Sequence, residues 1–415
     1  MAEETAQVLD LVHPSLFCYV QRTSRKTEEE ARPYHKFIGS GQPGTGDLIP
    51  TILATSPYGW PHDAAEDYST SKTYQWLPSE FRVSKEGKVT IRSYINNLHP
   101  VWHRELYPVI AKIFERFVPL FNKVLTDLRQ PEWHRIDDDS WECYEAKPKK
   151  SDFPSLEAYY NACDEWQEKR EPIQPTPPPY SGVALPDSST EVDLKGRDLQ
   201  VIVKLANIVL TPDKPEYDGG VWHVEGMENE NIVASGIYYY EVENVTDSFL
   251  AFRQAVQEPS YEQNDEKVPT QIYGLPDEAS LNQQLGQVRT CEGRCLAFPN
   301  VFQHRVSPFS LEDRSWPGHR KILVFFLVDP ARRILSTSHV PPQQSSWFAD
   351  SLQKLLWEAG RLPPEITDHI VSFLDWPMKL EEAKAHREVL MKERKFFIQS
   401  NTEELFERPF SLCEH

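Results

Sequence analysis

The chain has 415 residues, and its 63 acidic and 44 basic residues give a formal net charge of −19. This charge repels polyanions, so a nucleic-acid partner is not expected. Hydrophobic residues make up 39% of the chain, which is typical of globular proteins, and no apolar run reaches the roughly 20 residues of a membrane span. The first residues, MAEETAQVLD, lack the basic and apolar regions of a signal peptide. We therefore expect a cytoplasmic protein without a membrane partner.

The first part of the chain predicts loops followed by helices. Residues 1–90 are rich in Pro, Gly, Ser and Thr and predict an irregular wrapping segment with a short strand at 88–91. Residues 101–128 carry apolar residues at helical spacing, and Pro108 and Pro119 predict a break or kink there. A second helix is expected over 155–169. The run PIQPTPPPYSG then ends this helical N-terminal region, 91–182, as a proline-rich linker.

The next part, 183–335, has the pattern of short strands. The segments 198–210, 231–245 and 320–328 are rich in β-branched and aromatic residues, which predicts a barrel or jelly roll. The segment 320–328 is apolar at both odd and even positions, so helices should cover one of its faces. The predicted helices at 101–128 and 155–169 are available for this. Residues 336–415 predict a helical C-terminal extension.

One short motif carries candidate metal ligands. His223 and Glu225 are separated by one residue, so both side chains point to the same side of an extended chain. An imidazole and a carboxylate on one side are two ligands of the facial triad that binds non-haem iron(II). His304 lies on a strand-like segment 79 residues after Glu225 and is the candidate third ligand. The alternative is a hydrogen-bonded core histidine beside a glutamate that caps a turn.

A cation at the start of an apolar strand suggests a co-substrate site. Arg320 follows His304 by 16 residues and begins the segment HRKILVFFLVD. A buried guanidinium is costly unless it is paired, and the distal carboxylate of 2-oxoglutarate would be a suitable bidentate partner. Arg314 and Lys321 remain alternatives for this contact. Asn207 interrupts an apolar segment and could hydrogen-bond the co-substrate, or else pair with a neighbouring loop.

With these residues the chain resembles the iron(II)/2-oxoglutarate-dependent dioxygenase superfamily. The segments SYINNLHP, GGVWHVEGMENENIVASGIYYYE, FPNVFQHRV and GHRKILVFFLVDP are similar to the fungal family catalogued as domain of unknown function 4246. The resemblance implies an α+β protein with a double-stranded β-helix (jelly-roll) core at 183–335 and helical additions at both ends. It also implies that His223, Glu225 and His304 hold Fe(II), and that Arg320 and Asn207 contact 2-oxoglutarate.

The implied activity is oxidation, by hydroxylation or desaturation, of a small organic molecule such as a fungal natural-product intermediate, with 2-oxoglutarate and O2 as co-substrates. Two alternatives stay open. The first is a β-helix protein that binds or scaffolds without turnover, and the second is a metal-dependent jelly-roll enzyme that does not use 2-oxoglutarate. Neither the substrate nor the oligomeric state can be read from the sequence.

Overall fold

The computed structural model describes residues 7–24, 69–129, 143–174, 176, 191–259, 261–262, 265–358, 363–373 and 377–412. Most of the predicted proline-rich linker lies outside these ranges. In chain order the elements are β1 Val8–Val12, β2 Tyr19–Val20, β3 Tyr74–Gln75, β4 Ser79–Val83, β5 Val89–Ile91, α2 Leu106–Asp127, η2 Lys150–Asp152, α3 Leu156–Lys169, β6 Asp198–Leu210, β7 Glu216–Tyr217, η3 Glu228–Glu230, β8 Ile232–Glu243, β9 Phe249–Ala255, α4 Lys267–Ile272, β10 Asn282–Arg289, β11 Cys295–Pro299, β12 Gln303–Val306, β13 Phe309–Ser310, β14 Gly318–Val328, α5 Ser345–Glu358, α6 Pro364–Ser372, α7 Leu380–Asn401 and η4 Thr402–Phe406.

The protein is a mixed helix-and-sheet structure whose sheets are antiparallel. The largest sheet has seven strands in the order β11-β8-β14-β6-β4-β5, and β1 also pairs with β6. The three longest strands, β6, β8 and β14, coincide with the segments 198–210, 231–245 and 320–328, so these predicted strands are confirmed. Their β-branched and aromatic residues pack well on a pleated surface that is covered on both sides.

A second sheet lies beside the first and has the strand order β10-β9-β12. His304 of β12 also forms an isolated antiparallel bridge with His223, on the edge of β12 that faces away from β9. Short pairings of β13 with β7 and of β2 with β3 complete the strand network of the described residues. Within those residues the two larger sheets remain separate, and no closed barrel forms.

Helix α2 covers one face of the large sheet. Leu323, Phe325 and Leu327 of β14 belong to the same buried cluster as the aromatic residues of α2. The ring centroids of Phe114 and Phe117 lie 5.1 and 5.3 Å from that of Phe325. This packing is an aromatic contact at the distance that such pairs prefer.

The close approach of α2 depends on a glycine in β8. A β-carbon at Gly236 would lie 2.6 Å from Cδ1 of Phe117, which is too short for a real contact. Helix α2 also runs without interruption through Pro119, so of the predicted break or kink the break does not occur, and the kink stays a prediction. Pro108 lies in the first turn, where no intrahelical hydrogen bond is lost.

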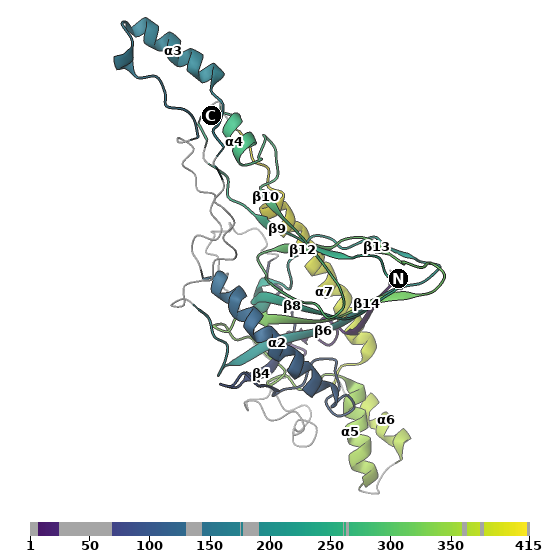
Figure 1. Ribbon diagram of the computed structural model, residues 1–415. Helices are drawn as coiled ribbons and strands as arrows, with labels where there is room; N and C mark the ends of the chain where they lie inside the picture. Colours follow the sequence, from purple (N-terminus) through teal and green to yellow (C-terminus); the bar gives the residue numbers. More distant parts are fainter. Residues whose placement is uncertain are drawn as a thin grey trace.

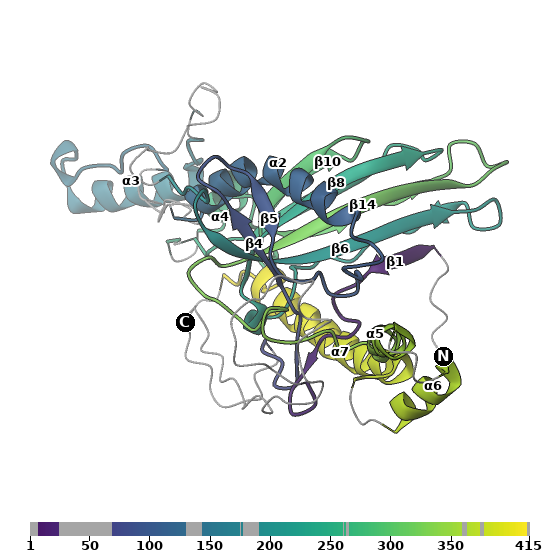
Figure 2. The same ribbon diagram turned by 90° about the horizontal axis from the view of Figure 1, so that it is seen from below.

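The other face of the large sheet is turned toward the small sheet and α7. Val324 and Phe326 of β14 share a buried cluster with Ala383 and Leu390 of α7. Figure 2 shows α2 and α7 on opposite sides of the strands β6, β8 and β14. The alternation expected within β14 is therefore confirmed, with odd positions against α2 and even positions in the interior between the sheets.

One expectation about the helices is wrong, and the N-terminal segment is only partly as predicted. Helix α3 does not cover the sheet but projects away from it (Figure 1). It has a single buried residue, Cys163, and its Leu156 and Tyr160 side chains are exposed. In the segment 1–90, residues 1–6 and 25–68 lie outside the described residues. The described parts contain the predicted strand at 88–91 as β5, and also β1 and β4, which pair with β6 in the large sheet. The predicted C-terminal helices are present as α5, α6 and α7.

The division into four domains at residues 90, 182 and 335 stays a prediction. Among the described residues, no helix is both long and apolar enough to cross a membrane.

Candidate metal centre

The backbone brings two distant histidines together. The N–H of His223 donates to the carbonyl of His304 at 3.2 Å, and the N–H of His304 donates to the carbonyl of His223 at 3.0 Å. Their imidazole centroids are 4.4 Å apart. His304 also pairs with Phe252 of β9, so the small sheet holds this side chain in place. The predicted proximity of the two histidines is thus found in the structure.

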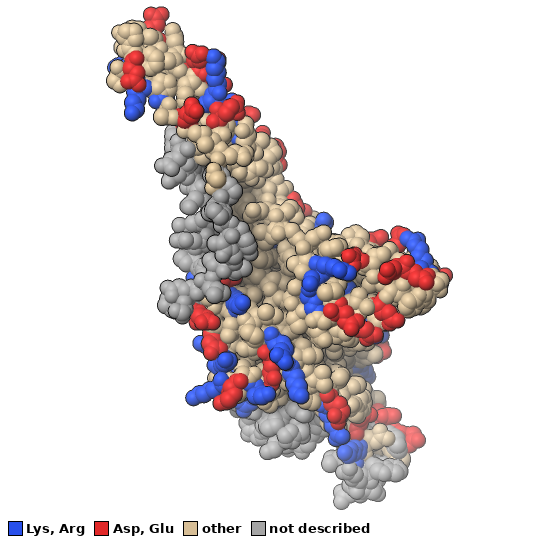
Figure 3. All heavy atoms as spheres, in the orientation of Figure 1, with Lys and Arg blue, Asp and Glu red and all other residues tan. Residues whose placement is uncertain are grey.

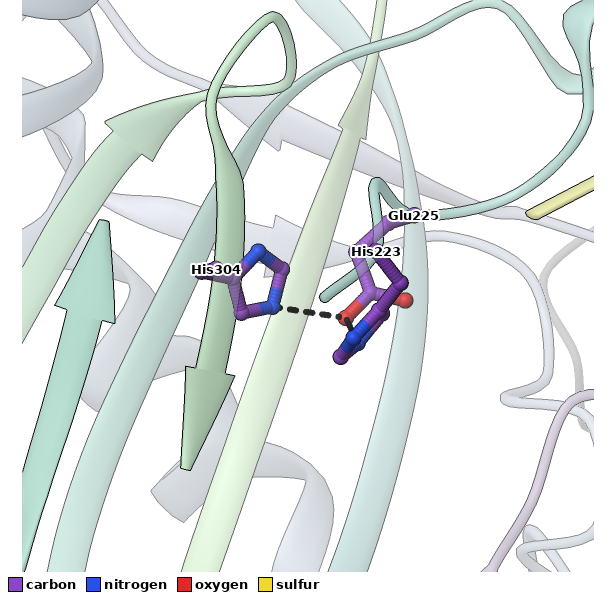
Figure 4. A group of neighbouring side chains, drawn as sticks. All are labelled: His223, Glu225 and His304. Carbon is purple, nitrogen blue, oxygen red and sulfur yellow. Dashed lines mark ion pairs between the residues drawn. The ribbon is translucent and has the colours of Figure 1, made fainter. Parts of the chain in front are cut away.

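Glu225 completes a compact group of three side chains (Figure 4). Its Oε1 atom lies 3.7 Å from Nε2 of His223 and 3.4 Å from Nε2 of His304. All three candidate ligand atoms lie within 4.8 Å of one another. His304 is 4% exposed, whereas the His223 side chain is 28% exposed, so the group opens to solvent on the His223 side.

A side chain that the sequence reasoning missed positions the backbone of Glu225. The Glu225 N–H donates to Oδ1 of Asn300 at 2.8 Å, and Nδ2 of Asn300 donates to the carbonyls of Glu225 and Ile232 at 2.9 and 3.0 Å. Asn300 lies in the FPNVFQH segment just before His304, and this closeness to a candidate ligand was the available signal. Asn300 therefore ties the two halves of the group together.

The turn after Glu225 needs a glycine. Gly226 has φ +74°, a conformation that side-chain-bearing residues rarely adopt. A β-carbon there would also lie 2.7 Å from Cδ1 of Ile232 and 2.9 Å from Oε2 of Glu230. The sequence Glu-Gly at this position thus places the carboxylate beside the histidines and turns the chain away into η3.

The three ionisable groups perturb one another. Burial raises the pKa of Glu225, but contacts with His223 and His304 outweigh burial and hold this pKa well below its usual value of 4.5. Burial also lowers the pKa of His223, yet the hydrogen bond and charge of Glu225 raise it above 6.5 overall. Burial and the neighbouring His223 lower the pKa of His304. Mutual contact thus favours the charged forms of Glu225 and His223, whereas the environment of His304 disfavours its charged form.

The donor set fits a divalent transition metal. Two imidazole nitrogens and one carboxylate oxygen are the ligand types of a facial iron(II) triad. Ligands on one face of an octahedron with bonds of about 2.1 Å are about 3 Å apart, close to the separations between Glu225 and the two histidines. The Nδ1 atom of His223 lies 2.8 Å from the carbonyl of Val221, which leaves Nε2 for a metal.

Arg320 is a buried cation on the interior face of the large sheet. It is 2% exposed, and its guanidinium donates only to Oγ of Ser248 at 3.4 Å and Oγ1 of Thr290 at 3.3 Å. The rings of Tyr239 and Phe309 lie 5.5 and 5.1 Å from its Cζ atom. Nε of Arg320 has no hydrogen-bond partner, and no carboxylate of the described residues lies within 4.0 Å of the guanidinium.

The alternative anchors are already engaged on the surface. Arg314 pairs with Glu216 at 2.6 Å, and both side chains are 61% exposed. Lys321 pairs with Glu241 at 2.8 Å and, as the next residue in β14, points to the opposite face from Arg320. Of the three candidates, Arg320 is the one with unmet capacity to bind an anion.

The structure does not support the expected role of Asn207. This residue pairs with Lys321, which places it on the face away from Arg320, and its Oδ1 accepts a 3.2 Å hydrogen bond from the hydroxyl of Tyr240. The structure thus places Asn207 away from Arg320, and its contact with a co-substrate stays a prediction. Side chains alternate between the two faces along β6. Because Ile208 pairs with Arg320, the adjacent Asn207 points to the opposite face.

A second group of potential ligands lies on the surface. Glu241, Glu243 and His319 also have ligand atoms within 4.8 Å of one another. The group is exposed at Glu243 and already contains a cation, because Lys321 pairs with Glu241. It is better explained as a solvated ion-pair network than as a metal site.

The family comparison bears on this group of residues. The family described as "Protein of unknown function (DUF4246)" matches residues 1–351. The chain belongs to this family. The match covers His223, Glu225, His304 and Arg320, and it confirms the family that the sequence motifs indicated. No curated protein matched the chain.

Solved structures that resemble the chain are distant. A structure titled "IDO from Bacillus thuringiensis" has 12% identity and a TM-score of 0.21 over 33% of this chain and 48% of that chain. The Fe(II)/(alpha)ketoglutarate-dependent dioxygenase TqaL has 15% identity and a TM-score of 0.23, covering 45% of this chain and 55% of that one. Hydroquinone 1,2-dioxygenase PnpCD has 12% identity and a TM-score of 0.15, with 35% and 64% covered. The matched part spans about half the length of the first two proteins, and we base the proposed function on this chain's own residues.

Proposed function

We propose that this protein is an iron(II)- and 2-oxoglutarate-dependent dioxygenase whose two sheets form a double-stranded β-helix core. The observation that carries the proposal is the convergence of His223, Glu225 and His304 beside an interior face that also bears the unpaired Arg320. A metal triad alone would suit several oxidative or hydrolytic enzymes. The additional buried cation without a carboxylate partner favours a small anionic co-substrate.

The residues have separate roles in this proposal. His223, Glu225 and His304 hold iron(II) on one side and leave the other positions to exchangeable ligands. Arg320 binds the distal carboxylate of 2-oxoglutarate, and Ser248 and Thr290 orient its guanidinium. Iron(II) with 2-oxoglutarate and O2 supplies an oxidation that is coupled to decarboxylation of 2-oxoglutarate to succinate.

The position of Arg320 is consistent with a co-substrate that reaches both sites. Ser248, which accepts from Arg320, precedes β9, and His304 pairs with Phe252 on the same strand. Arg320 therefore reaches the residue just before β9, and His304 lies in the strand β12 that pairs with β9. The buried cluster around Phe298 and Phe252 borders His304 and would keep the reacting atoms away from bulk water.

The test is an anaerobic titration of the protein with iron(II) and then with 2-oxoglutarate. We expect one iron per chain, followed by the weak visible absorption of the 2-oxoglutarate chelate. His223→Ala and His304→Ala should each abolish stoichiometric iron binding, while His319→Ala in the surface group should not. Full iron occupancy in both triad variants would refute the metal centre.

Two other outcomes would select the alternative functions. Iron binding without 2-oxoglutarate binding favours a metal-dependent enzyme that does not use this co-substrate. Binding of both without succinate formation under any substrate tried favours a binding or scaffold protein.

The primary substrate in this proposal is a small organic molecule, and hydroxylation and desaturation are both compatible with it. On the face shown in Figure 3, basic and acidic side chains are interspersed and neither forms a continuous patch. This distribution and the net charge of −19 accord with the expectation of no nucleic-acid partner, which stays a prediction.

A further inference from the structure

Lys204 is a second cation on the interior face of the large sheet. It pairs with Val324 of β14, so its side chain leaves the sheet on the same face as Val324 and Phe326. This is also the face of Arg320, since Arg320 pairs with Ile208, four residues further along β6. At about 3.3 Å per residue, the two cations emerge roughly 13 Å apart along the strand.

Lys204 has no anionic partner in the part of the chain that the structure describes. No carboxylate lies within 4.0 Å of its Nζ atom, and no hydrogen bond engages it. Asp10, which the strand register places on the same face opposite Ala206, bonds to Arg387 of α7 at 2.7 Å. Glu230 pairs with Arg394, and Glu225 lies beside the two histidines of the candidate metal centre. Lys204 is therefore left without an ion-pair partner among the described residues.

This lysine emerges on the interior face that reaches the candidate metal centre. Its neighbours Ile202 and Val324 share a buried cluster with Phe298 and Phe252, whose ring centroids lie 4.8 and 6.4 Å from that of His304. Lys204 is partly exposed, unlike Arg320, so a molecule entering from solvent can reach it. Its neighbours on the interior face, Ile202 and Val324, are apolar.

We infer that Lys204 binds a carboxylate of the primary substrate, so that the protein oxidises an organic acid with an apolar body. This inference rests on the proposed function and deepens it. Two unpaired cations on one face define two anion positions, and the more deeply buried Arg320 suits the co-substrate that is common to every turnover. The partly exposed Lys204 suits a substrate that must enter after it, and the apolar residues beside it suit the rest of that molecule.

The probe pair is 3-phenylpropanoate and its primary amide, 3-phenylpropanamide, which share one skeleton and differ in charge. Their affinities are measured by ligand-observed NMR on the metal-free full-length protein. We expect the acid to bind the parent protein roughly 3- to 10-fold more tightly than the amide, as for one partly exposed charge-assisted contact. Lys204→Met should remove this preference, whereas Lys214→Met, an exposed lysine after the same strand, should keep it. Arg320→Gln should keep it as well.

The same variants separate the possible sources of the carboxylate. If Lys204→Met weakens 2-oxoglutarate binding while Arg320→Gln does not, Lys204 anchors the co-substrate and the inference is overturned. Lack of an acid preference in the parent, including lack of binding, or its persistence in Lys204→Met, also overturns it. If iron(II) or 2-oxoglutarate does not bind the parent protein, the proposed function is refuted instead. The two failures can be told apart because the probe affinities are measured without iron(II) and without 2-oxoglutarate.

Discussion

Replacing Arg320 with glutamine should maintain or raise the free energy of unfolding of the ligand-free protein, but lower its affinity for 2-oxoglutarate. The guanidinium is 2% exposed and makes two hydrogen bonds of 3.3 and 3.4 Å to hydroxyls, without a carboxylate partner. Burial lowers the pKa of Arg320, which means that its charge costs free energy in the ligand-free fold. We therefore expect Arg320→Gln without ligands to have a free energy of unfolding at least as high as that of the parent.

Co-substrate binding should weaken strongly in the same variant. A charge-assisted bidentate contact contributes about 2 to 3 kcal/mol, which corresponds to a roughly 30- to 150-fold loss of affinity for 2-oxoglutarate. At 2-oxoglutarate equal to about 100 times the parent Kd, binding stabilises the parent by about 2.7 kcal/mol. A 50-fold weaker variant would gain only about 0.6 kcal/mol under the same conditions.

The assay is anaerobic urea denaturation with iron(II) in every sample, with and without 2-oxoglutarate. Arg314→Gln and Lys321→Gln are matched controls, because both residues are paired with surface glutamates and should leave the ligand effect unchanged. Equal stabilisation of Arg320→Gln and the parent by 2-oxoglutarate would refute the assignment. A loss confined to one of the controls would move the anchor to that residue.

Further predictions concern the metal centre and the packing around it. Glu225→Asp should retain part of the iron affinity because the ligand chemistry is kept, whereas Glu225→Ala should lose most of it in the same iron titration. Because Glu225 raises the pKa of His223 above 6.5, iron must displace a proton near and below that pH. Calorimetry should therefore show iron affinity rising from pH 6 to pH 8 with proton release at the lower pH, and a pH-independent affinity would contradict this. Gly236→Ala should lower the free energy of unfolding by about 1–3 kcal/mol through its clash with Phe117. In the double variant, Phe117→Leu should recover part of this loss. If urea denaturation shows that the effects of the two substitutions simply add, the clash is not the cause. Arg394→Met should cost about 3–5 kcal/mol by leaving a buried carboxylate unpaired, and an unchanged denaturation midpoint would show that this ion pair is not needed.

Local chain geometry accounts for the arrangements of side chains that the sequence could predict. The spacing of His223 and Glu225 places both side chains on one side of an extended chain, whatever the surrounding fold. The apolar residues of 320–328 at both parities required cover on both faces, and the structure supplies α2 on one and the small sheet with α7 on the other. These properties follow from a two-residue period that is written into the sequence itself.

Partners across the fold could not be read in this way. The N-terminal residues 8–12 became a strand because β6 offered an unpaired edge, and their own composition did not reveal this. Helix 155–169 has the expected length, yet it projects from the sheet and buries only Cys163. Asn207 looked suited to the co-substrate, but only the register between β6 and β14 showed that it faces away from Arg320.

The candidate site shows the same division. The sequence by itself determined which residue types can hold a metal and which side chains share a side of their own strand. The tertiary structure decided that His223 and His304 are bridged partners and that Asn300 holds the backbone of Glu225. It also decided that Arg320 and Lys204 have no carboxylate partner among the residues that the structure describes. The physical reason is that alternation along a strand is a local property, whereas the register of strands and the pairing of charges depend on contacts between residues far apart in the chain.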